Sequence, residues 1–143
     1  MTFRQLSIED VDQISNLYHK HFSDGWSKQM LVSAFNGGRF LCLGAFENQN
    51  LIGVVTSSTT AYDADLESII VSPEFRQQGI GKKLLSMLIE KLEMLNILKI
   101  FLEVRESNLS ARVFYEKNGF SKISKRKKYY PDGEDALVYL RGE

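Results

Sequence analysis

The sequence predicts an α/β fold in which about four helices flank a mixed β-sheet of about seven strands. Segments with strand-like alternation are interspersed with segments of amphipathic helical period. From residue 66 the order is strand, glycine-rich turn, helix, strand, helix, strand, strand, which is typical of layered α/β structures. The 143 residues, 43% of them hydrophobic, predict one domain over residues 1–143 with a substantial core.

The N-terminal segment predicts a short strand and a helix. Residues 2–6 have strand character, and Ser7 can cap the helix that follows, with Asp10 in its first turn. This helix extends to about His21, because apolar residues recur at spacings of three and four. Those residues are Val11, Ile14, Leu17, Tyr18 and Phe22.

A second helix and a β-hairpin should follow. Ser27 can cap a helix that residues 36–38, Asn-Gly-Gly, would stop. Residues 39–49 and 50–62 both read as strands, and the turn-prone residues 48–50 lie between them. This pattern predicts an antiparallel hairpin.

Strands and a long helix alternate between residues 65 and 106. Residues 65–72 form a predicted strand that Pro73 ends. The following helix carries an apolar stripe of Leu84, Leu85, Leu88, Leu92 and Leu95. In the strand at 98–106, alternation places Ile100, Leu102 and Val104 on one side and Phe101, Glu103 and Arg105 on the other.

The last segment predicts one helix and two strands. Asn108 can cap a helix that residues 118–119, Asn-Gly, would stop. Residues 120–130 and 134–142 have strand character around the turn at residues 131–133.

The bulk composition excludes several classes of partner. Eighteen basic residues balance eighteen acidic ones, so charge predicts neither nucleic-acid binding nor attraction to an anionic membrane. The N-terminus lacks the basic start and apolar stretch of a signal peptide, and no apolar run is long enough for a membrane span. We therefore expect a cytoplasmic protein.

Cysteine, histidine and the basic run at residues 125–128 do not indicate separate sites. Cys42 is the only cysteine and lies in a predicted strand, so we expect a buried, inert thiol. His19 and His21 point apart on a helix, so we expect no metal. The basic run could contact RNA, but the acidic residues at 132–135 largely cancel its charge.

The glycine-rich turn "RQQGIG", residues 76–81, predicts an anion site. The first amides of a helix lack partners within it, and the helix dipole makes this end electropositive. Glycines at 79 and 81 permit positive φ and remove Cβ atoms from the approach to the amides. Lys82 and Lys83 oppose the dipole, so they favour a bound phosphate, although both could simply extend into water.

Two common phosphate loops do not fit this turn. A Walker loop needs glycine at position 76 and serine or threonine at 83, where the chain has arginine and lysine. A dinucleotide-binding loop needs glycine at position 84, where the chain has leucine.

The context of the turn resembles a known family. "IIVSPEFRQQGIGKKLL" is similar to the coenzyme A pyrophosphate loop of the GNAT superfamily of acetyltransferases. "FLEVRESNLSARVFYEKNGF", followed by "KKYYPDGEDALVYL", resembles the C-terminal half of RimI-type ribosomal-protein-alanine N-acetyltransferases. "GWSKQML" resembles their tryptophan-serine segment, although Gly25 stands where the family has proline. The resemblance implies the GNAT fold, with a mostly antiparallel sheet.

The resemblance also implies acetyl-CoA as cosubstrate and no metal. Backbone amides from Gln77 to Lys82 would hold the diphosphate, and Ile69 to Val71 would pair backbone groups with the pantetheine arm. Asn108 would contact the coenzyme and could also cap its helix. The implied coenzyme-binding residues are Ile69, Ile70, Val71, Arg76, Gln77, Gln78, Gly79, Ile80, Gly81, Lys82 and Asn108.

Two residues are implied to carry the proton transfers. The resemblance makes Glu103 the general base and Tyr115 the general acid. Glu103 should lie near the carboxyl end of its strand, and a phenol with a pKa near 10 can donate a proton to a departing thiolate. The alternatives are that Glu103 is solvated or paired with Arg105, and that Tyr115 belongs to the core.

Glu67 is the rival base. It precedes Ile69 and Val71 on the same predicted strand, and we expect all three on one face. Many GNAT enzymes outside the RimI type draw their base from this strand, whereas the residues around Glu103 match the family better.

Three aromatic residues are implied to lie beside the acceptor. Trp26, Tyr129 and Tyr130 could form the walls of the slot through which the amine enters. Core packing is the alternative for each of them.

The expected function is acetyl transfer from acetyl-CoA to the N-terminal α-amine of a protein, above all the N-terminal alanine of a ribosomal protein. Other protein N-termini, lysines and small amines stay open, because a fold does not dictate its acceptor. A non-catalytic acyl-CoA-binding module is the alternative outside the enzymes. We expect a monomer or weak dimer without nucleic-acid or membrane partners.

Overall fold

The computed structural model describes residues 1–21 and 25–142. Its elements, including two short 3-10 turns (η), follow in the order β1 (Thr2–Gln5), η1 (Ile8–Asp10), α1 (Val11–His21), α2 (Lys28–Asn36), β2 (Phe40–Glu47), β3 (Asn50–Thr59), β4 (Asp63–Val71), η2 (Pro73–Phe75), α3 (Ile80–Met94), β5 (Lys99–Arg105), α4 (Leu109–Lys117), β6 (Ser121–Arg126) and β7 (Ala136–Arg141). The predicted α/β class is confirmed. Phe22, predicted on the apolar face of α1, lies outside the described residues.

Most predicted boundaries agree with the structure, because local capping groups set them. The side chains of Ser27 and Asn108 cap α2 and α4 by accepting hydrogen bonds from backbone amides two or three residues into each helix. Several strands are shorter than predicted, and the difference is largest for β6. The strand expected at residues 120–130 ends at Arg126, so Tyr129 and Tyr130 lie in the connection to β7.

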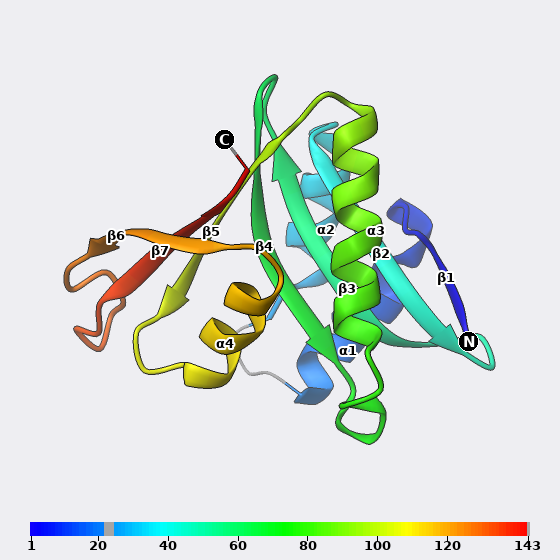
Figure 1. The fold of residues 1–143 in the computed structure, drawn as a ribbon. Helices are drawn as coiled ribbons and strands as arrows, with labels where there is room; N and C mark the ends of the chain where they lie inside the picture. Colours follow the sequence, from blue (N-terminus) through cyan, green and yellow to red (C-terminus); the bar gives the residue numbers. More distant parts are fainter. Residues whose placement is uncertain (22–24, 143) are drawn as a thin grey trace.

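The strands form one sheet in the order β1-β2-β3-β4-β5-β7-β6. Each neighbouring pair is antiparallel except β4 and β5, which run parallel. The mixed, mostly antiparallel sheet that the sequence and its resemblance predicted is therefore confirmed. β4 and β5 pair only over residues 63–65 and 99–101, and Figure 1 shows them separating beyond this point.

Helices cover both faces of the sheet. α3 and α4 pack on one face, over a first core cluster that includes Leu84, Leu102 and Tyr139. α1 and α2 pack on the other face, over a second cluster that includes Leu31 and Val54 (Figure 1). Within the part of the chain that the structure describes, no helix combines the length and apolar character needed to cross a membrane.

A β-bulge changes the predicted faces of β4. Ser68 pairs with Thr56 and Leu66 pairs with Ser57, so Glu67 is an extra residue opposite β3. Ile69 and Val71 pack against the first core cluster, as Leu66 does. The expectation that Glu67 shares their face is wrong, because the extra residue shifts the alternation by one position.

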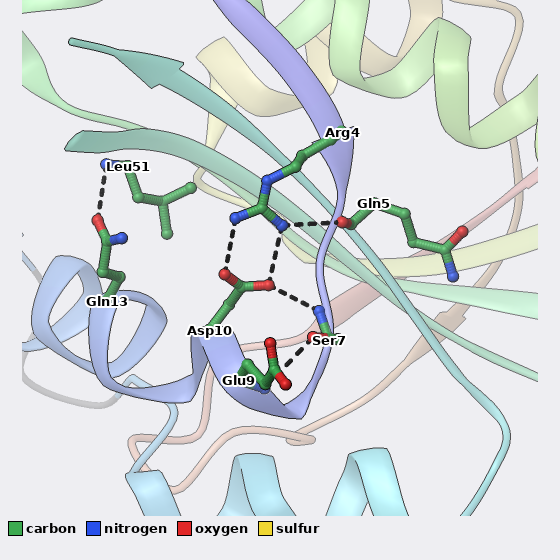
Figure 2. Close-up of polar contacts among 7 residues, drawn as sticks. All are labelled: Arg4, Gln5, Ser7, Glu9, Asp10, Gln13 and Leu51. Carbon is green, nitrogen blue, oxygen red and sulfur yellow. Dashed lines mark hydrogen bonds and ion pairs between the residues drawn. The ribbon is translucent and has the colours of Figure 1, made fainter. Parts of the chain in front are cut away.

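A polar network fastens the N-terminal segment to the sheet (Figure 2). Arg4 of β1 donates two hydrogen bonds to the Asp10 carboxylate, at 2.8 and 3.0 Å, and the Ser7 amide donates a third at 2.8 Å. The Gln13 side-chain oxygen accepts from the Leu51 amide of β3 at 3.0 Å. The start of α1 is thus tied to both β1 and β3.

The Arg4–Asp10 pair makes a prediction about stability. Asp10→Asn should lower the free energy of unfolding at pH 7 by about 1–2 kcal/mol, because it breaks a charge-assisted cap. Arg4 holds the pKa of Asp10 below its usual value. The wild type's advantage should therefore be fully present above the unfolded pKa of about 4 and be lost as the pH falls from there through the lowered pKa of the folded state. Urea melts at pH 7 and at a series of pH values below 4 measure both effects.

Asp12→Asn is the control for this prediction. Asp12 pairs with Lys28 at 2.9 Å, but both side chains are more than half exposed. Its loss should change the free energy of unfolding by less than about 0.5 kcal/mol. Equal losses in the two variants would contradict the assigned role of Asp10.

Candidate active site

The glycine-rich turn presents the start of α3 to an open cleft. Gly79 is the N-cap of α3 with φ of 77°, and a Cβ there would meet nothing within 4 Å. Position 79 therefore favours glycine because of its backbone angle, and not because a side chain would lack space. Gln77 also has positive φ, 63°, which the sequence did not indicate. The first-turn amides of α3 have no partners within the helix, as an anion site requires.

The cleft beside this turn has a volume of about 360 Å³ and lies between the turn and α4. It carries three cationic side chains, Arg76, Lys82 and Lys117. The other lining residues are Val71, Phe75, Gln77, Gly79, Ile80, Gly81, Phe114 and Asn118. A flexible anionic group with an apolar part fits this lining.

A second cleft, of about 440 Å³, continues the first between β4 and α4. Val71, Arg76, Gly81 and Phe114 line both clefts, so the two form one groove. We call it the coenzyme groove, after the ligand that the sequence led us to expect there. Its remaining lining residues are Ile69, Ile70, Asn108, Ser110, Ala111 and Tyr115. The groove follows the edge of β4 where β5 has separated from it.

The structure separates the two lysines of the turn. Lys82 lines the groove, whereas the Lys83 ammonium lies 4.4 Å from the centre of the Phe3 ring in β1. Only Lys82 is therefore placed to meet an anion there. Gln78, expected to bind the coenzyme, is exposed and does not line the groove.

Tyr115 lies at the wall of the groove and is largely buried. Its ring packs edge-on against Phe114 and Phe120, with centroids 5.5 and 5.6 Å away. Burial raises the pKa of Tyr115 to about 12. Its phenol is therefore protonated at neutral pH and can donate a proton.

A third pocket, of about 500 Å³, lies between β4, β5 and the β6–β7 connection. We call it the carboxylate pocket, because Asp65, Glu67 and Glu103 all line it. Burial and the neighbouring carboxylate charges raise the pKa values of Asp65 and Glu67. Arg126 is the cation among its lining residues.

Glu103 is held by two residues next to or within the β6–β7 connection. The Arg126 Nε atom lies 2.8 Å from Glu103 Oε2, and the Tyr129 hydroxyl donates to Oε1 at 3.2 Å. Arg105, the partner considered from the sequence, instead pairs with Asp132 and Glu134. The Glu103 carboxylate is thus oriented by contacts that come from a distant part of the chain.

The structure brings Tyr129 and Tyr130 together but places Trp26 elsewhere. The tyrosine rings meet edge-on at 5.2 Å, and the Arg105 guanidinium lies 4.1 Å from the centre of the Tyr130 ring. Trp26 packs on Phe40, with centroids 5.2 Å apart, and does not line the carboxylate pocket.

The sequence did not single out Arg126, Lys117, Phe114 or Asp65. Phe114 and Lys117 lie one helical turn apart, so helical spacing from the groove-lining Ala111 could have indicated them. Arg126 could not be selected from its basic run, because its pairing with Glu103 depends on how β6 and β5 are placed in the sheet.

The site contains no visible arrangement for a metal. Within residues 1–21 and 25–142, no group of three or more His, Cys, Asp or Glu side chains could hold a metal ion.

Comparisons with known proteins identify the family of the chain. The model of the "Acetyltransferase (GNAT) family" matches residues 11–120. The chain is 43% identical over 127 residues to the [ribosomal protein bS18]-alanine N-acetyltransferase of Haemophilus influenzae, covering 89% of this chain and 86% of that protein. It is 31% identical over 140 residues to the enzyme of that name from Escherichia coli K12, covering 96% and 94%.

Solved structures give the same result. The ribosomal-protein-S18-alanine N-acetyltransferase from Escherichia coli superposes with a TM-score of 0.89 at 30% identity, covering 99% of this chain and 92% of that one. The PaiA N-acetyltransferase from Thermoplasma acidophilum, in complex with coenzyme A, shares the fold with a TM-score of 0.80 at 24% identity and full coverage of both chains.

The buried phenol of Tyr115 yields a test by pH. Its pKa of about 12 exceeds the unfolded value of about 10, so the unfolded chain releases this proton first. The buried, protonated phenol therefore contributes its full stabilisation below pH 10, and the free energy of unfolding should fall as the pH rises from about 10 to 12. The Tyr115→Phe variant should lose less stability over this range. Carbon-13 NMR of labelled tyrosine, assigned with that variant, measures the pKa directly, and a value at or below 10 would contradict the burial.

Proposed function

The chain belongs to the GNAT acetyltransferase family and is an N-acetyltransferase that uses acetyl-CoA, and from this premise we propose that it acetylates the N-terminal alanine of ribosomal protein bS18. The curated relatives at 30% identity or more carry that activity in their names. Since ribosomal proteins are made in the cytoplasm, we place the reaction there.

One observation carries this proposal: the coenzyme groove and the carboxylate pocket lie along the same strand, β4. The groove combines cations and helix-start amides, which suit the phosphates of acetyl-CoA. The pocket combines three carboxylates, which suit an amine that arrives as a cation. Donor and acceptor would therefore approach β4 from different pockets.

We assign the coenzyme contacts by position in the groove. The backbone of Gln77 and of residues 79–82 would hold the diphosphate at the start of α3. Ile69 to Val71 would offer the unpaired edge of β4 to the pantetheine arm. The side-chain oxygen of Asn108 accepts a hydrogen bond from the Ala111 amide, so the side-chain NH₂ of Asn108 stays available to the coenzyme.

The chemistry follows from two proton transfers. An α-ammonium group has a pKa near 8, so Glu103 can accept its proton directly or through one water. The free amine then attacks the thioester carbonyl and the new C–N bond forms. As the intermediate collapses, the C–S bond breaks and the nitrogen releases its second proton to water, which leaves a neutral amide. Tyr115 donates a proton to the departing thiolate, which leaves as the thiol. Tyr129 and Tyr130 would lie beside the acceptor's first residues.

Replacing the proposed base tests this assignment. Glu103→Gln should lower turnover on an alanine-ended peptide by a hundredfold or more and leave acetyl-CoA affinity unchanged, by the usual size of general-base effects. Thiol release and calorimetric titration measure the two quantities.

Glu67→Gln is the comparison variant, because Glu67 lines the same pocket. It should reduce turnover less than Glu103→Gln does. If Glu103→Gln keeps full turnover while Glu67→Gln loses it, the base is Glu67 and the bulge supplies it.

The acceptor itself is tested with a peptide panel. A peptide with the N-terminal sequence of bS18 should release thiol from acetyl-CoA faster than versions that begin with serine, glycine or methionine. A version with a blocked N-terminus and a free lysine should release the least, because a lysine amine near pKa 10.4 is harder to deprotonate. Faster thiol release with the blocked peptide would show that the acceptor is a lysine and not the N-terminus of bS18. If none of these amines caused thiol release, the result would favour a non-catalytic acyl-CoA-binding protein.

A further inference from the structure

The bulge in β4 separates two segments of the strand that line different pockets. Before it, Asp65 faces the carboxylate pocket, and the extra residue Glu67 faces that pocket as well. After it, Ile69 and Val71 return to the first core cluster and line the coenzyme groove. The position of the bulge therefore sets where the pocket ends and the groove begins.

Three hydroxyl groups meet at this bulge, two of them on buried residues and the third on the half-buried Ser68. Ser68, which follows the extra residue, shares a hydrogen bond of 2.7 Å with the Thr56 hydroxyl of β3. It shares another with the Tyr18 hydroxyl of α1. Thr56 has no exposed surface, and Tyr18 is 4% exposed. The hydroxyls come from three elements and converge on one residue of β4.

Apolar surroundings make it costly to break the hydrogen bonds among these hydroxyl groups. The hydroxyls lie at the second core cluster, where Cys42, Val54 and Ile70 provide apolar neighbours. A buried hydroxyl without a hydrogen-bond partner costs about 1–3 kcal/mol. Sliding β4 by one residue would remove Ser68 from both partners at once, so the hydroxyls favour one register.

Burial also keeps the Tyr18 phenol in its neutral form. Burial raises the pKa of Tyr18 to about 12, and the nearby Cys42 and Glu67 add to this increase. The hydrogen bonds to Ser68 and Thr56 lower the pKa but do not outweigh the burial. The phenol can therefore take part as a neutral hydrogen-bonding group across the physiological pH range.

We propose that the hydroxyls of Tyr18, Thr56 and Ser68 form a positioning network that fixes the bulge in β4 for acetyl transfer. The network touches neither substrate. It acts through Glu67, which it keeps in the carboxylate pocket, and through residues 69–71, whose backbone edge it keeps along the coenzyme groove. The inference rests on the proposed function, because it assigns the two stretches of β4 to acceptor and coenzyme.

Two substitutions remove one hydroxyl each with little change in volume. Thr56→Val and Tyr18→Phe should each lower kcat/KM with an alanine-ended peptide by about tenfold to a hundredfold, because displacements of about 1 Å at a site have effects of this size. They should also raise the Kd for acetyl-CoA by about tenfold, or about 1.4 kcal/mol, since residues 69–71 move with the bulge. If one variant fails to fold, the other decides.

Two further variants separate positioning from general stability. Ser57→Ala removes a hydroxyl with no exposed surface from the neighbouring residue, but that hydroxyl donates to the Leu41 carbonyl of β2 at 2.9 Å and not to β4. It should lower the melting temperature as Thr56→Val does, yet keep kcat/KM and Kd within about twofold, because its loss leaves the bulge in place. Thr56→Ser keeps the hydroxyl and should therefore have the kcat/KM and the acetyl-CoA Kd of the wild type.

Equal losses of kcat/KM in Ser57→Ala and Thr56→Val would overturn the proposal, as would wild-type kcat/KM and Kd in both Thr56→Val and Tyr18→Phe. The acetyl-CoA titration needs no acceptor. If wild-type protein acetylates no alanine peptide while the Kd values still follow the expected order, the proposed acceptor fails and the network stands.

Discussion

The separation of β4 and β5 after three paired residues is the constraint on which the site depends. Adjacent strands normally satisfy each other's backbone NH and C=O groups. Beyond Asp65 the edge of β4 no longer has β5 as a partner, and the coenzyme groove and the carboxylate pocket open beside it. The separation of the two strands therefore leaves both open space and an unpaired backbone edge on β4, and the proposed pairing with the pantetheine arm uses this edge.

The charges of the site are sorted along this split. Arg76, Lys82 and Lys117 line the coenzyme groove, while carboxylates dominate the other pocket, where Glu103 pairs with Arg126. A protein with zero formal net charge thus gathers cations in one groove and carboxylates in the neighbouring pocket, and the proposed binding of acetyl-CoA and an amine rests on this arrangement. The balanced total conceals this arrangement, because only the folded chain collects like charges from distant segments.

Local signals predicted most of the fold. Ser27 and Asn108 cap their helices as expected, because capping bonds form within a few residues of the chain. Four leucines of the predicted stripe on α3 lie in the first core cluster, since a helix with one apolar face has one way to bury it. The fifth, Leu95, is exposed, because the helix ends at Met94 and Leu95 is its C-cap. The extra residue at Glu67 escaped prediction, because a bulge is defined by a partner strand and leaves no clear pattern in its own.

The sequence by itself determined the element order, the glycine-rich turn before α3 and the resemblance to GNAT acetyltransferases, because backbone propensity, capping and motif spacing are written in neighbouring residues. Only the tertiary structure decided which face Glu67 occupies, that Arg126 and not Arg105 holds Glu103, and that Lys83 turns to Phe3 while Lys82 stays at the groove. Each of these depends on side chains that meet across the sheet, and their separation along the chain gives no sign of that meeting.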